Sequence, residues 1–397
     1  MTATRPTRPK VKVPKVAGPQ PRPVPATFVL LLLVIGALTV IGLVMVLSAS
    51  SVQALRTQGS SWYFFNRQLL WVALGTAALI ATSRVDYRLW RRIAIPVLGV
   101  SMAMMVLVLV PGVGVRVSGS SRWLGAGPFR MQPSELAKLG LLLFSADLLA
   151  RRSDRVREWR QTTRPVMGFL GAVALLLLLQ PDLGTTLVTG AIVFGVLFLA
   201  GTPMTWMGGL GAGAGALTLV LAKVEPYRWR RMTSFLNPFA DASNTGYQAA
   251  QGRIAMANGG LSGVGLGESR AKWGFLPAAH TDFIFAILGE ELGLAGSLAV
   301  VLLFAAFTFL GARAALRAPD RFGFLLAGGI TAWVVGQTVI NIGAVVGLLP
   351  ITGVPLPFVS SGGSSLIPMM AAMGMLLNVT RQGRPPNRRA KASVPSS

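Results

Sequence analysis

Ten long apolar stretches divide this chain of 397 residues, and they constrain its fold more than any other feature. Hydrophobic residues make up 52% of the sequence and charged residues only 13%, about half the share typical of a soluble domain. Apolar stretches of about 18 residues predict helices that cross a membrane. We therefore predict an all-α integral membrane protein with ten transmembrane helices, at residues 26–49, 65–82, 93–111, 133–150, 165–181, 185–201, 204–222, 283–312, 322–346 and 365–380.

The formal charge of the chain is +24, and its basic residues are distributed as this topology predicts. Ten spans place both termini on one side, and 24 of the 37 Lys and Arg residues fall in the tails and loops of that side. Because an excess of Lys and Arg marks the cytoplasmic side, both termini are predicted to be cytoplasmic. Anionic lipid headgroups then account for the charge, and no nucleic-acid partner is expected. A membrane domain at 26–380 lies between a disordered, proline-rich basic tail at 1–25 and a basic tail at 381–397.

Several classes of chemistry are excluded by residue types. The chain has no cysteine and a single histidine, which excludes disulfides, thiolate metal sites, cysteine nucleophiles and histidine-rich metal sites. No GxxxxGK[ST] pattern occurs, so nothing indicates ATP as an energy source.

One loop is long: residues 223–282, between the seventh and eighth spans, on the extracytoplasmic side. Aromatic and basic residues alternate along it, which predicts short helices lying at headgroup depth. Arg253 and Lys272 are candidates to bind a lipid phosphate or pyrophosphate, and the glycine run at 258–267 could offer backbone N–H groups. A simple amphipathic lid without chemistry is the alternative.

Charged residues at the start of the fourth span form the first candidate cluster. Burying a charge in hydrocarbon is costly, so such residues are candidates for function. Glu135 and Lys138 share a helix face beyond Pro133, and Arg130 and Trp123 precede them. We predict that Arg130 and Lys138 face an outward cavity that takes an anion, with Glu135 and Trp123 as further substrate contacts. The alternative is a local ion pair, with Lys138 extending outward to the interface.

A second cluster lies where the long loop enters the eighth span. Asp282 stands next to the membrane, where partial loss of water would improve it as a base, although it could equally cap the helix. His280 is predicted to orient or bind substrate. Glu290 and Glu291, two turns deeper, could pair with another span, and Asp182 is predicted to cap the helix that follows it.

Residues 350–365 combine three prolines with a run of serine and glycine and predict a non-helical loop. Such backbone is tolerated at membrane depth only where it lines a cavity, so Ser360 is a candidate substrate contact. A serine nucleophile paired with His280 is the alternative, but no G-x-S-x-G elbow supports it.

Together these motifs resemble the SEDS family of shape, elongation, division and sporulation proteins, over residues 26–380. The motifs that carry the resemblance are SRW at 121–123, QPSELAK at 132–138, QPDLGTT at 180–186, AHTDFIFAILGEELG at 279–293 and NIGAVVGLLPITGVPLPFVSSGGSS at 341–365. The segment GLGESRAKWGFLPAAHTDF indicates the division-type subfamily rather than the elongation type. Ser361 departs from the family pattern, which usually has a tyrosine there.

The resemblance implies a peptidoglycan glycosyltransferase that polymerises lipid II at the outer face of the cytoplasmic membrane. The family's catalytic aspartate falls on Asp282, and its basic residues fall on Arg130 and Lys138. Expected partners are lipid II, the nascent lipid-linked glycan, a class B penicillin-binding protein transpeptidase and other divisome membrane proteins at the septum. No cofactor is assigned, and a divalent cation, Mg²⁺ or Mn²⁺, is the open alternative. A lipid II flippase, an elongation-type polymerase and an inactive divisome scaffold are the alternatives.

Overall fold

The computed structural model describes residues 24–117, 120–126, 129–224, 229, 233–244 and 246–383. Ten long helices run through these residues, as the apolar stretches predict. Their bounds are α1 Ala26–Gln58, α2 Tyr63–Arg84, α3 Trp90–Leu109, α4 Pro133–Arg151, α5 Thr163–Leu179, α6 Leu183–Ala200, α7 Met204–Val224, α10 Ile284–Leu316, α11 Arg321–Val346 and α12 Gly363–Gln382. The predicted tails lie almost entirely outside the described residues.

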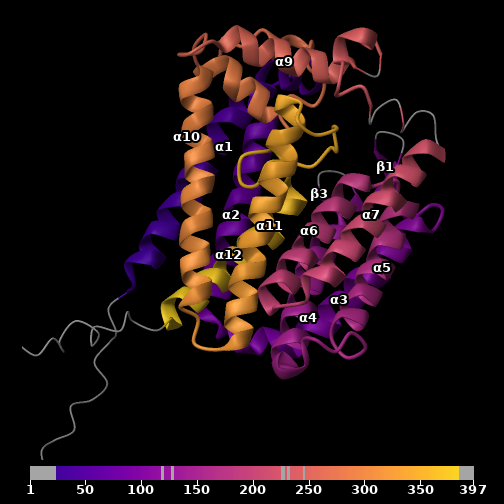
Figure 1. Ribbon diagram of the computed structural model, residues 1–397. Coiled ribbons are helices and arrows are strands. Elements are labelled where there is room, and N and C mark those ends of the chain that lie inside the picture. Colours follow the sequence, from indigo (N-terminus) through magenta and orange to yellow (C-terminus); the bar gives the residue numbers. More distant parts are fainter. Residues whose placement is uncertain are drawn as a thin grey trace, which may run out of the picture.

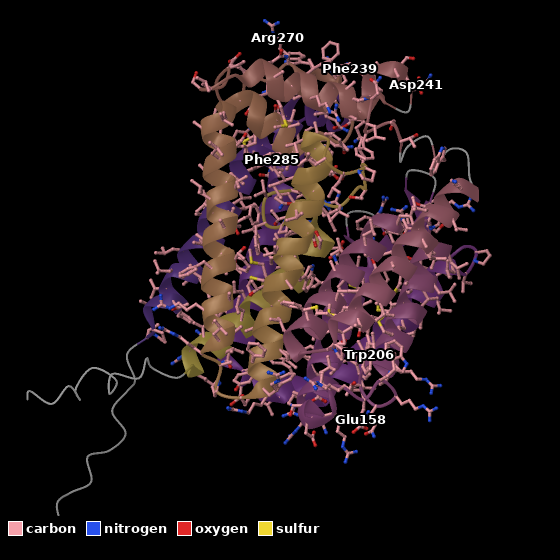
Figure 2. The ribbon with its side chains drawn as sticks, viewed as in Figure 1. Glu158, Trp206, Phe239, Asp241, Arg270 and Phe285 are labelled. Atoms are coloured by element: carbon pink, nitrogen blue, oxygen red, sulfur yellow. The ribbon has the colours of Figure 1, made fainter. Side chains whose placement is uncertain are left out.

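The ten helices form one bundle, and α9 (Tyr247–Gly259) lies across one end of it (Figure 1). We call this the α9 end. The helices α2 and α12 pack together, as do α3 and α4, α6 and α11, and α10 and α11. Figure 2 shows charged side chains gathered at the two ends, with Arg270 and Asp241 at the α9 end and Glu158 at the other. This distribution suits a protein that crosses a membrane.

Seven of the helices in the described chain are long and apolar enough to cross a membrane by composition alone, and α5 and the first part of α7 are shorter apolar helices. Helix α4 differs because it carries Glu135, Lys138 and Asp147 within its span. Nearly all of its first half is nevertheless buried in the bundle. Its charges are therefore satisfied by the protein rather than by lipid or water.

A small antiparallel sheet is present in addition to the helices, and the all-α prediction did not include it. Its strands precede α4 in the order β1 (Val115–Val117), β2 (Ser120–Ala126) and β3 (Phe129–Met131). Gly125 pairs with Arg130, so the sheet places Arg130 close to the start of α4. The sequence signal was weak because β1 and β3 are only three residues long.

Helix α10 is broken at Gly293, whose φ of 65° and ψ of −163° are not helical. Only glycine adopts this backbone conformation readily, and a Cβ there would collide with Gly263 and Leu261. The glycine segment after α9 pairs with the backbone on both sides of the break. The N–H groups of Val264 and Gly265 donate to the carbonyls of Glu290 and Glu291, and those of Leu294 and Ala295 donate to Gly260 and Leu261.

Candidate functional site

Asp282 lies at the α9 end of the bundle, where the long loop meets α10. The N-cap position of α10 is held by Phe283 and receives no side-chain cap hydrogen bond. Asp282 therefore lies one residue before the N-cap position of this helix. The Asp282 side chain is partly exposed, whereas the residues that follow it in α10 are buried. The carboxylate thus stands at the edge of the packed core.

Three hydrogen bonds, to the main-chain carbonyls of three consecutive residues, hold the backbone at Asp282. We call this set of bonds the carbonyl clamp. The donors come from α11 and from the α11–α12 loop, residues 347–362. Ser361 N donates to His280 O at 3.0 Å, Ser360 Oγ to Thr281 O at 2.6 Å, and Asn341 Nδ2 to Asp282 O at 2.8 Å. Ser360 Oγ also accepts from Leu356 N at 2.8 Å. The hydroxyl of Ser360, a predicted substrate contact, is thus engaged with backbone on both sides.

The α11–α12 loop also approaches the Asp282 carboxylate itself. A Cβ atom placed on Gly353 would lie 3.5 Å from Asp282 Oδ2, and Gly353 has a φ of 73°. The positive φ favours glycine here, whereas a Cβ atom at 3.5 Å would make only an ordinary van der Waals contact with the carboxylate. The prediction that this loop is non-helical is confirmed.

Glu135 and Lys138 form an ion pair inside the bundle. Lys138 Nζ lies 2.9 Å from Glu135 Oε2, and the two side chains are 2% and 5% exposed. Lys138 Nζ also donates to Gln337 Oε1 at 3.4 Å and lies 5.2 Å from the centre of the Trp333 ring. The ion pair predicted as an alternative is present, but Lys138 points into the core, so its outward extension to the interface is wrong.

Trp123 and Arg130 lie on the sheet at the entrance to α4, and both are partly exposed. Within the described chain, Arg130 Nε is buried without a hydrogen-bond partner. An unsatisfied buried guanidinium N–H is costly, and a bound anion would satisfy it.

The neighbouring Arg122 already has partners within the protein. Its Nε donates to Gln180 O at 3.0 Å, and its Nη1 lies 3.7 Å from Asp182. Asp182 caps α6 as predicted, accepting from Thr185 N at 3.0 Å, and it also accepts from Gln132 Nε2 at 3.0 Å. These contacts fasten the sheet and the start of α4 to the turn between α5 and α6.

Arg253 and Lys272 have contacts that hold the protein itself together. Arg253, on α9, donates to Phe235 O at 2.6 Å and to Gly347 O at 3.4 Å, next to the end of α11. Lys272 lies in the short turn Ala271–Trp273, and its Nζ is 3.6 Å from Glu291 Oε1 and also donates to Gly267 O. Neither residue contacts the Asp282 segment through these bonds.

Glu290 and Glu291 are both fully buried and organise the same turn. Glu290 accepts from Ser269 Oγ at 2.5 Å and from Ala271 N at 3.2 Å, and Glu291 accepts from Ser48 Oγ at 2.5 Å. The predicted bond to another span is confirmed for Glu291, whose partner Ser48 lies in α1, whereas the partners of Glu290 lie in the long loop. The glycine run at 258–267 donates N–H groups of Val264 and Gly265 to α10, so the phosphate cradle proposed there is not available through these two groups.

His280 is held in its neutral form. Burial lowers the pKa of its imidazole from 6.5 to about 4, and its ring lies 4.9 Å from that of Phe64. Among the described residues, His280 Nδ1 has no hydrogen-bond partner. A neutral imidazole of this kind can bind or orient a hydroxyl group but carries no charge at neutral pH.

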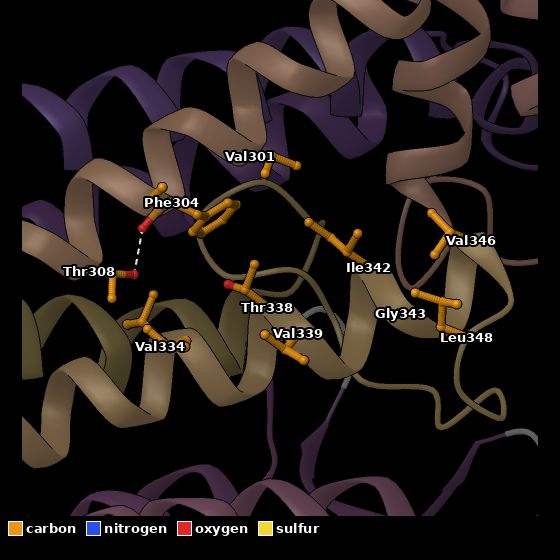
Figure 3. Close-up of a pocket in the computed structure, with 12 residues that line it drawn as sticks. Val301, Phe304, Thr308, Val334, Thr338, Val339, Ile342, Gly343, Val346 and Leu348 are labelled. Atoms are coloured by element: carbon orange, nitrogen blue, oxygen red, sulfur yellow. Dashed lines mark hydrogen bonds between the residues drawn. The ribbon is translucent and has the colours of Figure 1, made fainter.

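An apolar groove of about 340 Å³ lies elsewhere, between α10 and α11 (Figure 3). Phe304, Thr338 and Ile342 are among the residues that line it, and none of the predicted site residues is. The described residues also contain no group of three or more His, Cys, Asp or Glu side chains that could hold a metal ion.

Sequence reasoning missed Gln337 and Asn341 as site residues. They lie one turn apart on α11 and contact both Lys138 and the Asp282 segment. The signal was present, since two amides at a spacing of four in an apolar span predict a shared buried face.

Comparison with known proteins agrees with this architecture. The family model described as cell cycle protein, which covers FtsW, RodA and SpoVE, matches residues 28–385. The chain is 43% identical over 350 residues to a probable peptidoglycan glycosyltransferase FtsW of Geobacter metallireducens, covering 88% of this chain and 93% of that one. It is 42% identical over 358 residues to the stage V sporulation protein E of Bacillus subtilis, covering 89% and 97%.

Two solved structures share the fold. One, described under the heading of polymerization and crosslinking by a peptidoglycan synthase complex, matches with a TM-score of 0.74 and 31% identity over 89% of this chain and 97% of that chain. The rod shape determining protein RodA of Thermus thermophilus matches with a TM-score of 0.67 and 30% identity, covering 89% and 96%. On the sequence match, the order of its helices and these structural likenesses, the chain belongs to the SEDS family of FtsW, RodA and SpoVE cell cycle proteins.

Proposed function

We propose that this protein is a peptidoglycan glycosyltransferase that polymerises lipid II at the outer face of the cytoplasmic membrane. The observation that carries the proposal is the partly exposed carboxylate of Asp282, on a backbone segment that the carbonyl clamp holds at the end of the bundle. Relatives named as probable peptidoglycan glycosyltransferases support the reaction class. The positive-inside rule supports cytoplasmic termini, which place Asp282 on the outer side.

In the proposed reaction Asp282 takes the proton from the 4-hydroxyl of the acceptor sugar. The hydroxyl oxygen attacks the anomeric carbon of the donor chain, the bond to undecaprenyl pyrophosphate breaks, and a β-1,4 linkage forms with inversion. The pyrophosphate ester is already activated, so ATP is not required. A base in this role works best when it is fixed at the distance of a hydrogen bond from the hydroxyl.

Negative charge develops on the departing pyrophosphate, and a preorganised cation beside it should stabilise the transition state most. Arg130 is our first candidate because its buried Nε lacks a partner among the described residues. Lys138 is the second, although it is already paired with Glu135. Trp123, His280 and Ser360 are proposed to line the sugar path.

Arg253 and Lys272 stay candidates for substrate binding. Their present contacts, to α11 and to Glu291, support a role in shaping the outer layer. A divalent cation, Mg²⁺ or Mn²⁺, also stays a proposal. The described carboxylates do not gather into a resident metal site, so such an ion would be held mainly by the pyrophosphate.

We further propose a class B penicillin-binding protein as partner, together with other divisome membrane proteins at the septum. A structural relative comes from work on a peptidoglycan synthase complex that coordinates polymerization and crosslinking, which supports this pairing. A relative named FtsW supports division over elongation.

The test is reconstitution in liposomes with lipid II supplied on the outer leaflet. The wild-type protein should convert it to glycan strands and release undecaprenyl pyrophosphate, and Asp282→Ala should abolish both while the protein still folds and inserts. A flippase would leave outward-facing lipid II unpolymerised. Glycan strands made by purified Asp282→Ala would contradict the assignment.

A further inference from the structure

Two amide side chains on one face of α11 connect the two halves of the site. Gln337 and Asn341 lie four residues apart, which places them on the same helix face, and they are 1% and 2% exposed. Leaving a buried amide N–H unpaired is costly, and both amide nitrogens have partners, although Asn341 Oδ1 has none among the described residues. What they bond to therefore indicates why an apolar span contains them.

Both amides donate to the α11–α12 loop at consecutive residues. Asn341 Nδ2 donates to Val354 O at 2.7 Å, and Gln337 Nε2 donates to Pro355 O at 2.9 Å. This loop belongs to no helix or strand, so its buried carbonyls need side-chain donors. The two amides thereby fix the part of the loop that follows Gly353.

Each amide has a second contact, and the two second contacts differ. Asn341 Nδ2 also donates to Asp282 O at 2.8 Å, whereas Gln337 Oε1 accepts from Lys138 Nζ at 3.4 Å. Gln337 Oε1 is further held by Trp333 Nε1 at 3.0 Å. Helix α11 therefore connects the backbone of Asp282, the α11–α12 loop and the buried Lys138 of α4 by hydrogen bonds.

We propose that Asn341 is a positioning residue for the glycosyl transfer and acts by fixing the backbone of Asp282 against the α11–α12 loop. Gln337 has the matching role at Lys138. This inference rests on the proposed function, because it gives Asp282 the role of base. A catalytic group displaced by about 1 Å loses on the order of 100-fold in rate, so loss of the Asn341 bonds should reduce turnover more than binding.

The primary experiment compares Asn341→Leu with Thr338→Val in the full-length protein, reconstituted with lipid II. Leucine has the same branched arrangement of heavy atoms as asparagine but no donor. Thr338 is a matched control because it lies one turn away on the same helix, and its buried Oγ1 has no hydrogen-bond partner in the described chain. Its side chain faces the apolar groove of Figure 3 instead.

We expect Asn341→Leu to lower kcat by about 10- to 100-fold, with KM for lipid II within about threefold of wild type. Thr338→Val should keep both constants. A kcat within twofold of wild type in Asn341→Leu would overturn the inference, as would a loss confined to KM. Size-exclusion profiles and melting temperatures in detergent identify a variant that has lost its fold.

The clamp offers a second probe if Asn341→Leu does not fold. Ser360→Ala removes the bond to Thr281 O, whereas Ser360→Thr keeps a hydroxyl that can donate. We expect kcat to fall in the alanine variant and to recover in the threonine variant. Equal and normal kcat values in both would also overturn the inference.

An Asp282→Ala arm separates this inference from the proposed function. If Asp282→Ala is inactive and Asn341→Leu is normal, only the positioning role fails. If Asp282→Ala still polymerises lipid II, the proposed function fails, whatever Asn341→Leu does.

Discussion

A Cβ atom on Gly353 would stand 3.5 Å from Oδ2 of Asp282, in van der Waals contact with the proposed base. Gly353→Ala therefore adds a methyl group beside the proposed base and also imposes a side chain on a φ of 73°. The left-handed backbone alone costs about 1–2 kcal/mol. We expect reduced lipid II turnover together with a lower melting temperature.

Gly190→Ala is the matched control for Gly353→Ala. Gly190 lies inside α6, and a Cβ there would meet nothing within 4 Å. Alanine favours a helix over glycine, so stability should stay equal or rise slightly. Gly353→Ala with wild-type turnover would mean that the space beside Asp282 is not needed for the reaction.

The buried ion pair between Glu135 and Lys138 predicts different outcomes for single and double variants. Lys138→Met leaves the Glu135 carboxylate buried without its cation, which typically costs about 3–5 kcal/mol. Adding Glu135→Gln removes the unpaired charge and should restore most of the melting temperature.

Lipid II turnover by the double variant then shows whether Lys138 takes part in the reaction or only stabilises the fold. If Lys138 also stabilises the leaving pyrophosphate, the stable double variant Lys138→Met with Glu135→Gln should remain slow in the lipid II assay. Recovery of wild-type turnover along with stability would show that the pair serves the fold alone.

The helices could be predicted from sequence because each is a long apolar stretch, and the caps at Asp182 and the non-helical loop after α11 follow from local residue preferences. The sheet before α4 was missed because its strands are too short to give a clear alternation. The break at Gly293 was missed because it depends on a partner segment about 30 residues earlier in the chain.

The charged residues of the candidate site could be predicted from the sequence, whereas the spacing of the two amides predicts only that they share a buried face. A charge in an apolar span draws attention because of its insertion cost, which pointed to Lys138 and Glu135. Gln337 and Asn341 carry no charge, and the bonds that connect them to Lys138, Asp282 and Val354 depend on how the chain folds. The direction of Lys138, inward rather than outward, likewise depends on where α11 packs.

His280 should stay neutral throughout the physiological range, because burial lowers its pKa to about 4. The pKa of His280 is about 4 in the folded protein and 6.5 in the unfolded chain. Above pH 6.5 the imidazole is neutral in both states. Between pH 6.5 and 4 it takes up a proton more readily in the unfolded chain, so the free energy of unfolding decreases as the pH falls. His280→Phe keeps an aromatic ring against Phe64 and cannot take up a proton.

Melting temperatures of wild type and His280→Phe should therefore differ by a constant amount above pH 6.5. Between pH 6.5 and 4 the wild type should lose stability relative to the variant. A constant difference down to pH 4 would show that the imidazole is not shielded as its burial implies.

Lys272 is a second buried lysine paired with a glutamate, but unlike Lys138 we expect it to serve the fold alone. Its Nζ lies 3.6 Å from Glu291, and its other contacts are with Ser48 and Gly267. Lys272→Met should destabilise the protein by leaving the fully buried Glu291 without its cation. Combining Lys272→Met with Glu291→Gln should restore the melting temperature and, unlike the Lys138 pair, should also restore lipid II turnover. A stable double variant whose KM for lipid II rises tenfold would instead assign Lys272 to substrate binding, since such a rise without a change in kcat marks a lost ground-state contact.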